Sequence, residues 1–575
     1  MFKMFQNLRN HIPYVCTLIV LIFAQIICDL YLPTLMSSII NNGIMEENIP
    51  YILRFGGVML FVSGFGIICA VIASFLSAHV SADLGSVLRS RVFRCVESLS
   101  LHEFDNFGAS TLTTRTTNDI IQIQTFTILM LNMMLRAPLT AVGGIILAYR
   151  QDKGLTVIFA MAFPVLVALI AIVMGTAMPA FKHVQTKLDK VNLVMAENLK
   201  GILVIRAFNR IDHENRRFDY ANSDLTATYI KANQIMSFLL PGFMLAINAI
   251  VLFILWFGSI RVNTGEMNIG ALTAFLQYAV LIFSNFVMFS IMFVFLPRAQ
   301  TAAQRVSEVL ETRQEILEPV IAKIEENLKG VVEFRNVTFR YPGAEQPAIS
   351  GISFLARPGE TTAIIGGTGS GKSTLVGLIP RFYDVSEGKI LLDEINVKDM
   401  AQKELRVKIG FVPQTAVLFT GTIADNLRYG RKRATNEELE YAAKTAQAAD
   451  FIAETENGYD TMLSEGGGNL SGGQKQRLSI ARALVRHPEI YIFDDSFSAL
   501  DFKTDAALRA ALQKETENAT VFIVAQRVGT VMNADRIIVL DNGAVAGMGT
   551  HEELIKSCGI YQDIVSSQFS EEEMV

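Results

Sequence analysis

Residues 366–374, GGTGSGKST, decide how the second half of this 575-residue chain folds. They follow the apolar run 362–365, which is typical of a strand, and precede the run 375–379, which begins a helix. The spacing G-x-x-x-x-G-K-[ST] between a strand and a helix predicts a phosphate-binding P-loop, whose backbone N–H groups turn toward phosphate oxygens. Lys372 is expected to reach the β- and γ-phosphates of a nucleotide, and Ser373 to ligate Mg²⁺. The loop residues expected at the nucleotide are Gly366, Gly367, Thr368, Gly369, Ser370, Gly371, Lys372, Ser373 and Thr374.

Two shorter motifs follow this loop and narrow the class of protein. The sequence LSGGQ occupies residues 470–474, and the apolar run 490–493 ends at Asp494. A P-loop, an LSGGQ sequence and a Walker B aspartate in this order resemble the nucleotide-binding domain of ATP-binding cassette (ABC) proteins over residues 330–558. The resemblance implies that ATP sites also involve Ser471, Gly472, Gly473, Gln474, Asp494 and Asp501.

The composition of the chain indicates a membrane protein. Hydrophobic residues make up 51% of the sequence and its mean hydropathy is +0.36, which is too apolar for an ordinary soluble protein. The net charge of −5 is small and indicates no nucleic-acid partner. The five cysteines are scattered without metal-ligand spacing, so we expect buried thiols and no disulfide framework.

Six stretches are long and apolar enough to cross a bilayer as helices, which takes about 20 residues. Their low charge argues against buried helices of a soluble protein. The first run has no small-residue cleavage site behind it, so we expect it to remain as a span. The six stretches are residues 13–40, 51–82, 126–149, 155–181, 238–257 and 269–297.

The connections between these stretches alternate in length and charge. Residues 41–50, 150–154 and 261–268 are short, whereas 83–124 and 182–237 are long and rich in arginine and lysine. Because basic loops stay on the cytoplasmic side, the long connections and the ATP domain are expected there.

The long connections are expected to extend the spans as helices beyond the membrane. Apolar side chains recur at helix spacing in residues 83–101. In ABC exporters such extensions end in short coupling helices that dock on the ATP domains. The resemblance places the first near residues 116–122 and the second near 208–218.

Asp29 and Arg136 are the clearest charges inside the expected spans. Charges at membrane depth are costly and usually face a partner or an aqueous cavity. We hypothesise that the two residues line or brace a translocation cavity, together as a pair or separately. A purely structural ion pair is the alternative.

These features predict a multidomain membrane protein. Residues 1–312 are expected to form a six-helix, all-α transmembrane domain with long cytoplasmic helix extensions. Residues 313–330 form a linker, and residues 331–575 an α/β P-loop ABC nucleotide-binding domain. Because the N-terminal half resembles the membrane domain of exporters, the match covers nearly the whole chain, as an ABC exporter half-transporter.

The resemblance assigns roles to several further residues. Tyr341, at a strand end, is expected to stack on adenine. Gln414 matches the Q-loop glutamine, and the metal-binding set is Ser373, Gln414 and Asp494, the last acting through water. Asp501 belongs to a D-loop that crosses between subunits. Because the chain has one P-loop and one LSGGQ sequence, both ATP sites need a second cassette.

Two positions depart from the family pattern. The family usually has Glu directly after the Walker B aspartate and His about thirty residues later, whereas this chain has Asp495 and Gln526. An aspartate is one methylene shorter, and a glutamine cannot carry a positive charge. Because general-base catalysis is worth about 10²–10⁴-fold, we expect the catalytic set Asp495, Gln526 and Gln414 to hydrolyse ATP slowly or not at all.

We therefore expect one half of an ATP-driven exporter that moves a drug-like or lipid-like small molecule by alternating access. Its expected partner is a second half-transporter that supplies Glu and His, and its expected location is a prokaryotic inner membrane, surrounded by lipid. The alternatives are a homodimeric exporter, a dedicated lipid or peptide exporter, an exporter-fold importer, and an ATP-gated channel or regulatory subunit.

Overall fold

The computed structural model describes residues 12–319, 321 and 330–568, and its contacts divide the chain into two compact units. The helical unit consists of Met1–Glu97 and Ser110–Thr312, and the sheet unit of Ser98–Ala109 and Arg313–Val575. The sequence assigns residues 98–109 to the membrane domain, but their contacts group them with the sheet unit. Half of the expected linker, residues 320 and 322–329, lies outside the described residues.

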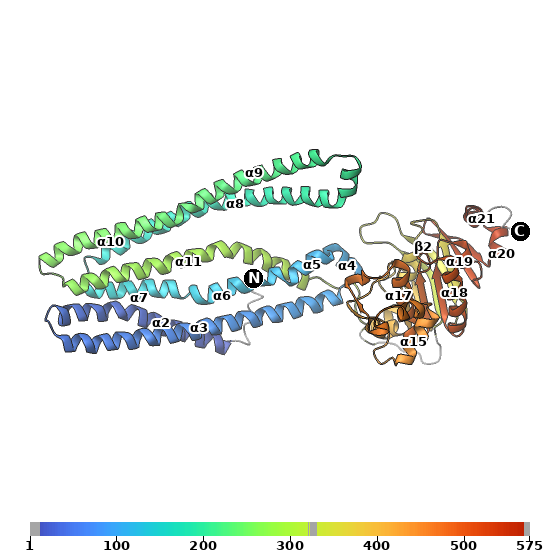
Figure 1. Cartoon of the computed structure of the whole chain (residues 1–575), viewed down its shortest axis with the longest axis horizontal. Coiled ribbons are helices and arrows are strands. Elements are labelled where there is room, and N and C mark those ends of the chain that lie inside the picture. The colour runs from blue at the N-terminus through green and yellow to red at the C-terminus, as the bar shows by residue number, and fades with distance from the viewer. Residues whose placement is uncertain (1–11, 320, 322–329, 569–575) are drawn as a thin grey trace. The chain divides into compact units, whose positions relative to one another are not determined.

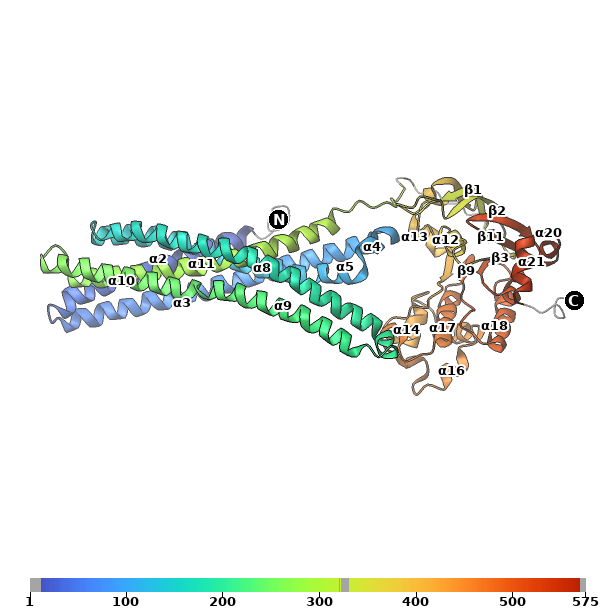
Figure 2. The same cartoon turned by 90° about the horizontal axis from the view of Figure 1, so that it is seen from above.

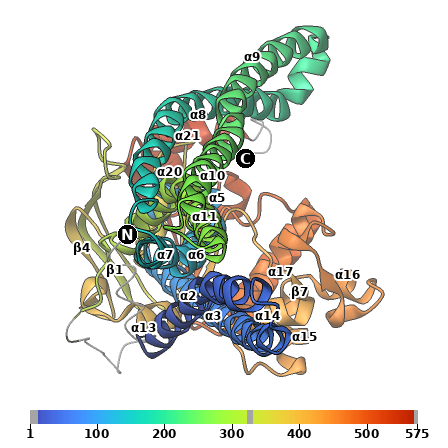
Figure 3. The ribbon, with the colours of Figure 1, turned by 90° about the vertical axis from the view of Figure 1, so that its left-hand side faces the viewer.

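Long helices joined by short turns make up the helical unit (Figure 1). The helix α11 packs against α2, α6, α7 and α10, and a view along the helices shows α6, α7, α10 and α11 grouped together (Figure 3). The helices are α2 (Ile12–Ile39), the π-helix η2 (Ile40–Ile44), α3 (Ile49–Ser98), α5 (Ala109–Thr116), α6 (Asn118–Met133), α7 (Arg136–Gln151), α8 (Thr156–Ala207), α9 (Ile211–Ser237), α10 (Leu239–Asn263) and α11 (Ile269–Leu310).

Five helical segments of the described chain are long and apolar enough to cross a membrane. The stretch expected as the fourth span lies in α8, whose described apolar part is the shorter segment Thr156–Ile172. Two helices far exceed a bilayer: α3 has 50 residues and α8 has 52, so each is about 75 Å long against a hydrocarbon core of ~30 Å. The five segments are Ile12–Ile44, Ile49–Ser98, Ala109–Gln151, Ile211–Asn263 and Ile269–Phe289.

The stretch expected as the third span is two helices rather than one. The chain leaves the helix at Met134 and Leu135, so residues 126–149 are divided between α6 and α7. Pro138 accounts for this break, because proline has no N–H to bond the carbonyl of Met134 and its ring crowds the preceding turn.

The helices α8 and α9 form a long pair that lies side by side in two perpendicular views (Figures 1 and 2). Ion pairs link them: Lys187 Nζ donates to Asp224 at 2.6 Å and Arg217 donates to Glu197 at 2.5 Å. The second short helix expected, at 208–218, is not separate, because this stretch is the turn after α8 and the first turns of α9.

The short helix α4 (Leu101–Phe107) belongs to the sheet unit and has well-defined ends. Ser100 caps it, since its Oγ accepts from the Glu103 N–H at 3.3 Å and Glu103 Oε2 accepts from the Ser100 N–H at 2.7 Å. Gly108, with φ of +74°, ends it. No separate short helix is found at the expected position, 116–122, because that stretch ends α5 and begins α6.

The Glu103 carboxylate also joins α4 to the chain that enters the sheet unit. Its Oε1 accepts from the main-chain N–H of Glu315 at 2.8 Å, and the residue is only 5% exposed. Two residues later, the Leu317 carbonyl accepts from the guanidinium of Arg381 at 3.2 Å. Residues 314–318 are therefore tied both to α4 and to the body of the sheet unit.

Three sheets form the sheet unit, with strand orders β12-β11-β3-β10-β9-β6, β2-β1-β4-β5 and β7-β8. The strands are β1 (Val332–Phe339), β2 (Ile349–Ala356), β3 (Thr361–Gly366), β4 (Glu387–Leu392), β5 (Ile395–Asn396), β6 (Ile409–Val412), β7 (Gly421–Thr422), β8 (Met462–Leu463), β9 (Ile490–Asp494), β10 (Thr520–Val524), β11 (Arg536–Asp541) and β12 (Ala544–Gly549). The α-helices are α12 (Lys372–Gly377), α13 (Gln402–Val407), α14 (Ile423–Arg428), α15 (Asn436–Thr445), α16 (Ala449–Ala453), α17 (Gly472–Val485), α18 (Phe502–Glu515), α19 (Val528–Val531), α20 (His551–Ser557) and α21 (Gly559–Ser566). Single 3₁₀ turns are η3 (Val397–Asp399), η4 (Gly458–Asp460) and η5 (Glu465–Gly467).

The six-stranded sheet confirms the α/β class expected for this half of the chain. Its strands β6, β9, β10, β3 and β11 run parallel, and β12 pairs antiparallel at the edge. The strand β9, which pairs with β10 on one side and β6 on the other, is buried along its whole length, as expected for a parallel strand covered on both faces. In such a sheet the carboxyl ends of the strands meet at one edge, where ligands usually bind.

Candidate nucleotide-binding site

Four parallel strands bring the expected site residues to one edge of the six-stranded sheet. The P-loop follows β3, Asp494 ends β9 and Asp495 follows it. Gln414 lies two residues after β6, and Gln526 two residues after β10. A pocket of about 280 Å³ lies at this edge. It is lined by Tyr341, Ala348, Thr368, Gly369, Gly371, Lys372, Ser373, Thr374, Gln414, Asp495, Val524 and Gln526.

Glycines shape the P-loop at two tight positions. Gly369 and Gly371 have φ angles of +82° and +96°, which residues with a Cβ rarely adopt. A Cβ on Gly371 would also lie 2.7 Å from the carbonyl oxygen of Ala348. The Ser370 hydroxyl is buried and has no hydrogen-bond partner among the described residues. The Ser370 hydroxyl and the main-chain N–H groups of the glycine-rich loop are therefore suited to bind a phosphate group.

Lys372 lies at the start of α12 with its ammonium folded back onto the loop. Its Nζ donates to the carbonyls of Gly366 at 3.0 Å and Gly367 at 2.7 Å. Burial lowers the pKa of this ammonium, and the carboxylates of Asp495 and Asp494 oppose that shift. A bound anion would stabilise the charged form further.

Ser373 and Asp494 form the pair of oxygen ligands expected for a magnesium site. The Ser373 hydroxyl donates to Asp494 Oδ1 at 2.8 Å. Burial raises the pKa of Asp494, and this hydrogen bond acts in the opposite direction. Hydroxyl and carboxylate oxygens are the hard ligands that Mg²⁺ prefers, so the residues present fit the ion.

The Asp495 carboxylate is held by two side-chain amides. Its Oδ2 accepts from Gln526 Nε2 at 2.9 Å and from Gln414 Nε2 at 3.3 Å. Burial raises the pKa of Asp495, opposed chiefly by the nearby Lys372. Its φ of +46° is uncommon for a residue with a side chain and marks local strain. The structure thus joins all three residues of the expected catalytic set.

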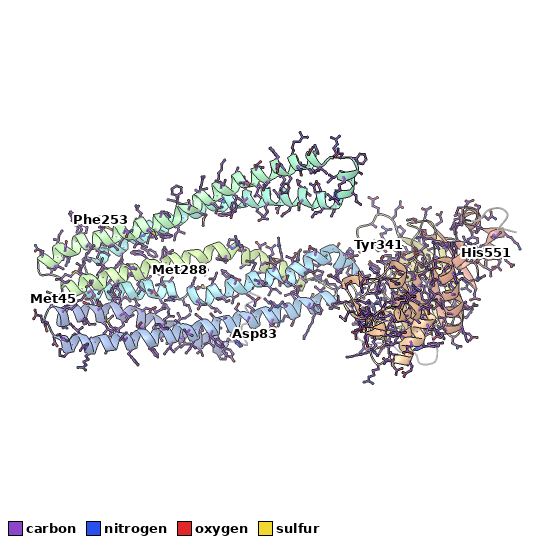
Figure 4. The ribbon with its side chains drawn as sticks, in the orientation of Figure 1. Met45, Asp83, Phe253, Met288, Tyr341 and His551 are labelled. Carbon is purple, nitrogen blue, oxygen red and sulfur yellow. The ribbon has the colours of Figure 1, made fainter. Side chains whose placement is uncertain are left out.

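Tyr341 lies on the rim of the pocket, in the sheet unit (Figure 4). Its hydroxyl and the Thr374 hydroxyl are 3.0 Å apart. Its ring meets the rings of Phe339 and Tyr383 edge to face, with centroids 4.9 and 5.4 Å apart. Tyr383 is a neighbour that the sequence analysis missed, because an aromatic residue in a loop between motifs gives no pattern that would reveal its contact with Tyr341.

Two pocket residues besides the expected ones are Ala348 and Val524. Val524 ends β10, so the strand pattern before Gln526 would have located it. Ala348 precedes β2 and packs its main chain against Gly371, a contact between segments that no local motif predicts.

The LSGGQ residues and Asp501 do not line the pocket of their own chain. Ser471 and Gln474 instead cap α17 reciprocally, with Gln474 Oε1 accepting from the Ser471 N–H at 2.9 Å. Asp501 caps α18 by accepting from the Thr504 N–H at 2.9 Å, and this bond lowers the pKa of Asp501. Gly472 and Gly473 form the first turn of α17.

Comparison with known families covers both halves of the chain. Residues 15–287 match the model of the ABC transporter transmembrane region, and residues 349–498 match the ABC transporter model. A solved structure of a bacterial Atm1-family ABC exporter with ATP bound has a TM-score of 0.82 and 25% identity, covering 98% of this chain and 99% of that chain.

Relatives match over nearly the same length. An uncharacterised ABC transporter ATP-binding protein of Mycobacterium tuberculosis is 41% identical over 98% of this chain and 97% of its own. One of Bacillus subtilis is 39% identical over 96% of each chain. An ATP-dependent lipid A-core flippase of Chromobacterium violaceum is 31% identical over 93% of this chain and 92% of its own.

The chain belongs to the ABC transporter family. It is an exporter-type half-transporter, with a transmembrane helical domain followed by one ATPase domain that couples ATP hydrolysis to transport.

Proposed function

We propose that this chain is the slowly hydrolysing half of a heterodimeric exporter. One observation carries the proposal: the Gln526 amide donates to the Asp495 carboxylate at 2.9 Å. In the family these two positions usually hold His and Glu. Here the shorter carboxylate is engaged by an uncharged amide, and no cation stands at position 526 to stabilise the transition state.

The expected loss of rate follows from what each group can do. A general base must reach the attacking water with a free lone pair, and Asp495 directs Oδ2 toward two amide donors. Losing a base typically lowers turnover by about 10²–10⁴-fold. We therefore assign ATP binding, rather than rapid hydrolysis, to this chain's own P-loop.

The remaining residues of the pocket are proposed to bind and orient the nucleotide. The P-loop amides and Lys372 hold the phosphates, and Tyr341 stacks on the adenine ring. Ser373, Asp494 and Gln414 hold Mg²⁺, which when bound neutralises charge on the β- and γ-phosphates. Asp495 retains a carboxylate near the γ-phosphate without the reach of a glutamate.

The LSGGQ sequence is proposed to act at the partner's site. Ser471 and Gly473 would contact the γ-phosphate of ATP held by the other subunit, and Asp501 would cross the same interface. Their absence from the pocket of their own chain supports this assignment. The second site can then be competent if the partner supplies Glu and His.

The proposed membrane arrangement has six spans, with residues 1–312, 313–330 and 331–575 as membrane domain, linker and ATP domain. Five helical segments and α8 support the count, and the lengths of α3 and α8 support cytoplasmic extensions. We propose α4 and the α8–α9 turn as coupling segments, in a prokaryotic inner membrane. The lipid A-core flippase among the relatives supports an amphipathic, lipid-like substrate.

Isolation of the native complex tests the heterodimer. The tagged chain, extracted from its own membrane in mild detergent, should carry a second ABC half-transporter at equal stoichiometry. That partner should have Glu after its Walker B aspartate and His at the position matching Gln526. Recovery of a dimer of this chain alone, active in transport, would contradict the proposal and favour a homodimeric exporter.

Retention of nucleotide tests the site itself. The native complex, loaded with ATP labelled in the adenine moiety and then washed, should keep label at this chain's P-loop as intact ATP. Lys372→Ala in this chain should remove that label. Rapid conversion of all bound label to ADP would contradict a slowly hydrolysing site.

A further inference from the structure

An ion pair lies between α2 and α7 of the helical unit. Arg136 Nη2 donates to Asp29 Oδ2 at 3.2 Å, so the pairing hypothesised from the sequence is confirmed. Both residues belong to segments apolar enough to cross a membrane, Ile12–Ile44 and Ala109–Gln151. A charged pair in such surroundings needs a reason beyond packing.

The two residues lie at the same depth. Asp29 precedes the end of its segment at Ile44 by fifteen residues, and Arg136 precedes Gln151 by the same number. At 1.5 Å per residue, both are about 22 Å from that end, inside a hydrocarbon core of ~30 Å. Met45, labelled in Figure 4, directly follows the end of the first segment at Ile44.

The Asp29 side chain faces away from the exposed apolar side of α2. Asp29 is two residues from Ile27 and from Tyr31, or about 200° around the helix. It shares its face with the buried residues Ile22 and Gln25. The exposed apolar stripe of α2 consists of Val20, Phe23, Ile27 and Tyr31.

The pair is accessible and its hydrogen bonding is incomplete. The side chains of Arg136 and Asp29 are 39% and 29% exposed. A guanidinium has five N–H donors, and Arg136 Nε is buried without a hydrogen-bond partner among the described residues. A single bond of 3.2 Å leaves most of this donor fork available to another acceptor.

The backbone around Arg136 adds to the local positive potential. The helix α7 begins at Arg136, after the break at Met134 and Leu135, and a helix N-terminus carries a partial positive charge. An anionic group beside Arg136 would therefore meet both a guanidinium and a helix end.

We propose that Arg136 binds the phosphate head group of an amphiphilic substrate, and that Asp29 positions the guanidinium while no substrate is bound. The proposal rests on the exporter function proposed above and names its substrate class. The planar guanidinium fork matches phosphate geometry. Asp29 competes with the phosphate for the same N–H groups.

Binding of short-chain lipids to the assembled transporter tests this assignment without ATP. The purified complex in maltoside detergent is titrated with dioctanoyl phosphatidic acid, and bound lipid is counted by native mass spectrometry. Dioctanoyl trimethylammonium-propane, a cationic lipid of the same chain length, is the charge control. Arg150→Gln, a change at an exposed arginine near the other end of α7, is the matched variant.

The two members of the pair should respond with opposite signs. Arg136→Gln should weaken phosphatidic acid binding by about tenfold, because a charge-assisted hydrogen bond is lost. Asp29→Asn should strengthen it, because a competitor for the guanidinium is removed, and Arg150→Gln should leave it unchanged. Arg136→Lys keeps the charge but loses the fork, so its affinity should fall between native and Arg136→Gln.

Three outcomes would overturn the proposal: equal losses of affinity in Asp29→Asn and Arg136→Gln, tighter binding of the cationic lipid than of phosphatidic acid, and no effect of any change at position 136. Equal losses accompanied by equal drops in Tm would identify a structural ion pair. Because the assay needs neither hydrolysis nor transport, its failure leaves the exporter proposal standing, and a failed transport assay leaves this binding result intact.

Discussion

Asp494 and Asp495 are neighbours at the end of β9, yet they serve two differently built halves of one site. Asp494 continues a buried strand and accepts from the Ser373 hydroxyl at 2.8 Å. Asp495 leaves the strand with a φ of +46° and accepts from two side-chain amides. The binding half, formed by the P-loop, Ser373 and Asp494, matches the family pattern. The hydrolytic half, formed by Asp495 and Gln526, departs from it, because the family usually has Glu and His at these two positions.

Under the proposed function, ATP binding and ATP hydrolysis are separable in this fold. The P-loop and the Ser373–Asp494 pair depend on backbone shape and oxygen ligands, which this chain retains. Hydrolysis depends on the length of the side chain at position 495 and on the charge at position 526. Both differ from the family pattern in this chain. A subunit that binds ATP without rapid turnover is the expected consequence.

The largest expected effect breaks the binding half. Lys372→Ala should weaken ATP binding at this chain's site by about 100-fold, because a buried ammonium that contacts the phosphates is lost. Equilibrium binding of a fluorescent ATP analogue to the purified chain measures the change. Lys432→Ala, at an exposed lysine of the same unit, is the control and should leave affinity unchanged. If Lys372→Ala bound the ATP analogue as tightly as the native chain, the P-loop would not be part of the ATP site.

A large effect on stability alone is expected at the α4 junction. Glu103→Ala should lower the free energy of unfolding of the sheet unit by about 1–3 kcal/mol, because the N–H groups of the buried Ser100 and of Glu315 lose their acceptor. Thermal melting of the full chain measures this loss, with the exposed Glu345→Ala as control. ATP affinity should stay the same, and a parallel loss of affinity would mean that this junction shapes the pocket.

A smaller effect sharpens the role of Asp494. Burial raises the pKa of Asp494, so its ionised form is disfavoured in the folded, nucleotide-free protein. The stability contribution of such a group is present below its unfolded pKa and is lost as pH rises through the folded pKa. Asp494→Asn should therefore raise the Tm at pH 7 by about 2–4 °C and abolish the dependence of ATP binding on Mg²⁺. A lower Tm at pH 7 would contradict this sign.

The smallest expected effect is that of a change at Asp495 on ATP turnover. Asp495→Asn should change ATP turnover of the native complex by less than about twofold, because an already slow site has little to lose, whereas a working general base is worth about 10²–10⁴-fold. Phosphate release measures the rate. A drop of 100-fold or more would show that Asp495 is catalytically adequate as it stands.

Much of the site was predictable because its residues follow sequence patterns. The strand before the P-loop, the strand ending at Asp494 and the strand before Gln526 are short apolar runs, and parallel pairing brings their ends together. The amide contacts of Gln414 and Gln526 on Asp495 join segments far apart in the sequence and were not predicted, although all three residues were expected at the site. Tyr383 and Ala348 reach the site through tertiary packing that no local pattern records.

The helices of the fold were predictable from the length of the apolar runs, whereas the residues at which helices begin and end were less predictable. The long apolar runs give the helices of the helical unit, but the break before Arg136 depends on how Pro138 is accommodated. The short helix expected near residues 116–122 is not separate, because that stretch ends α5 and begins α6, and the capping box of Ser100 and Glu103 was not recognised as a helix start. The grouping of residues 98–109 with the sheet unit depends on the Glu103 carboxylate reaching Glu315, a contact across more than 200 residues.

The most direct test of the central claim is steady-state ATP turnover of this chain alone in lipid, beside the variant Asp495→Glu/Gln526→His. The account predicts near-zero turnover in the native chain and a gain of about 100-fold or more in the double variant, which restores both the reach of the base and a cationic side chain. Substantial turnover in the native chain, unchanged by the double substitution, would contradict the account and make a homodimeric exporter the better description.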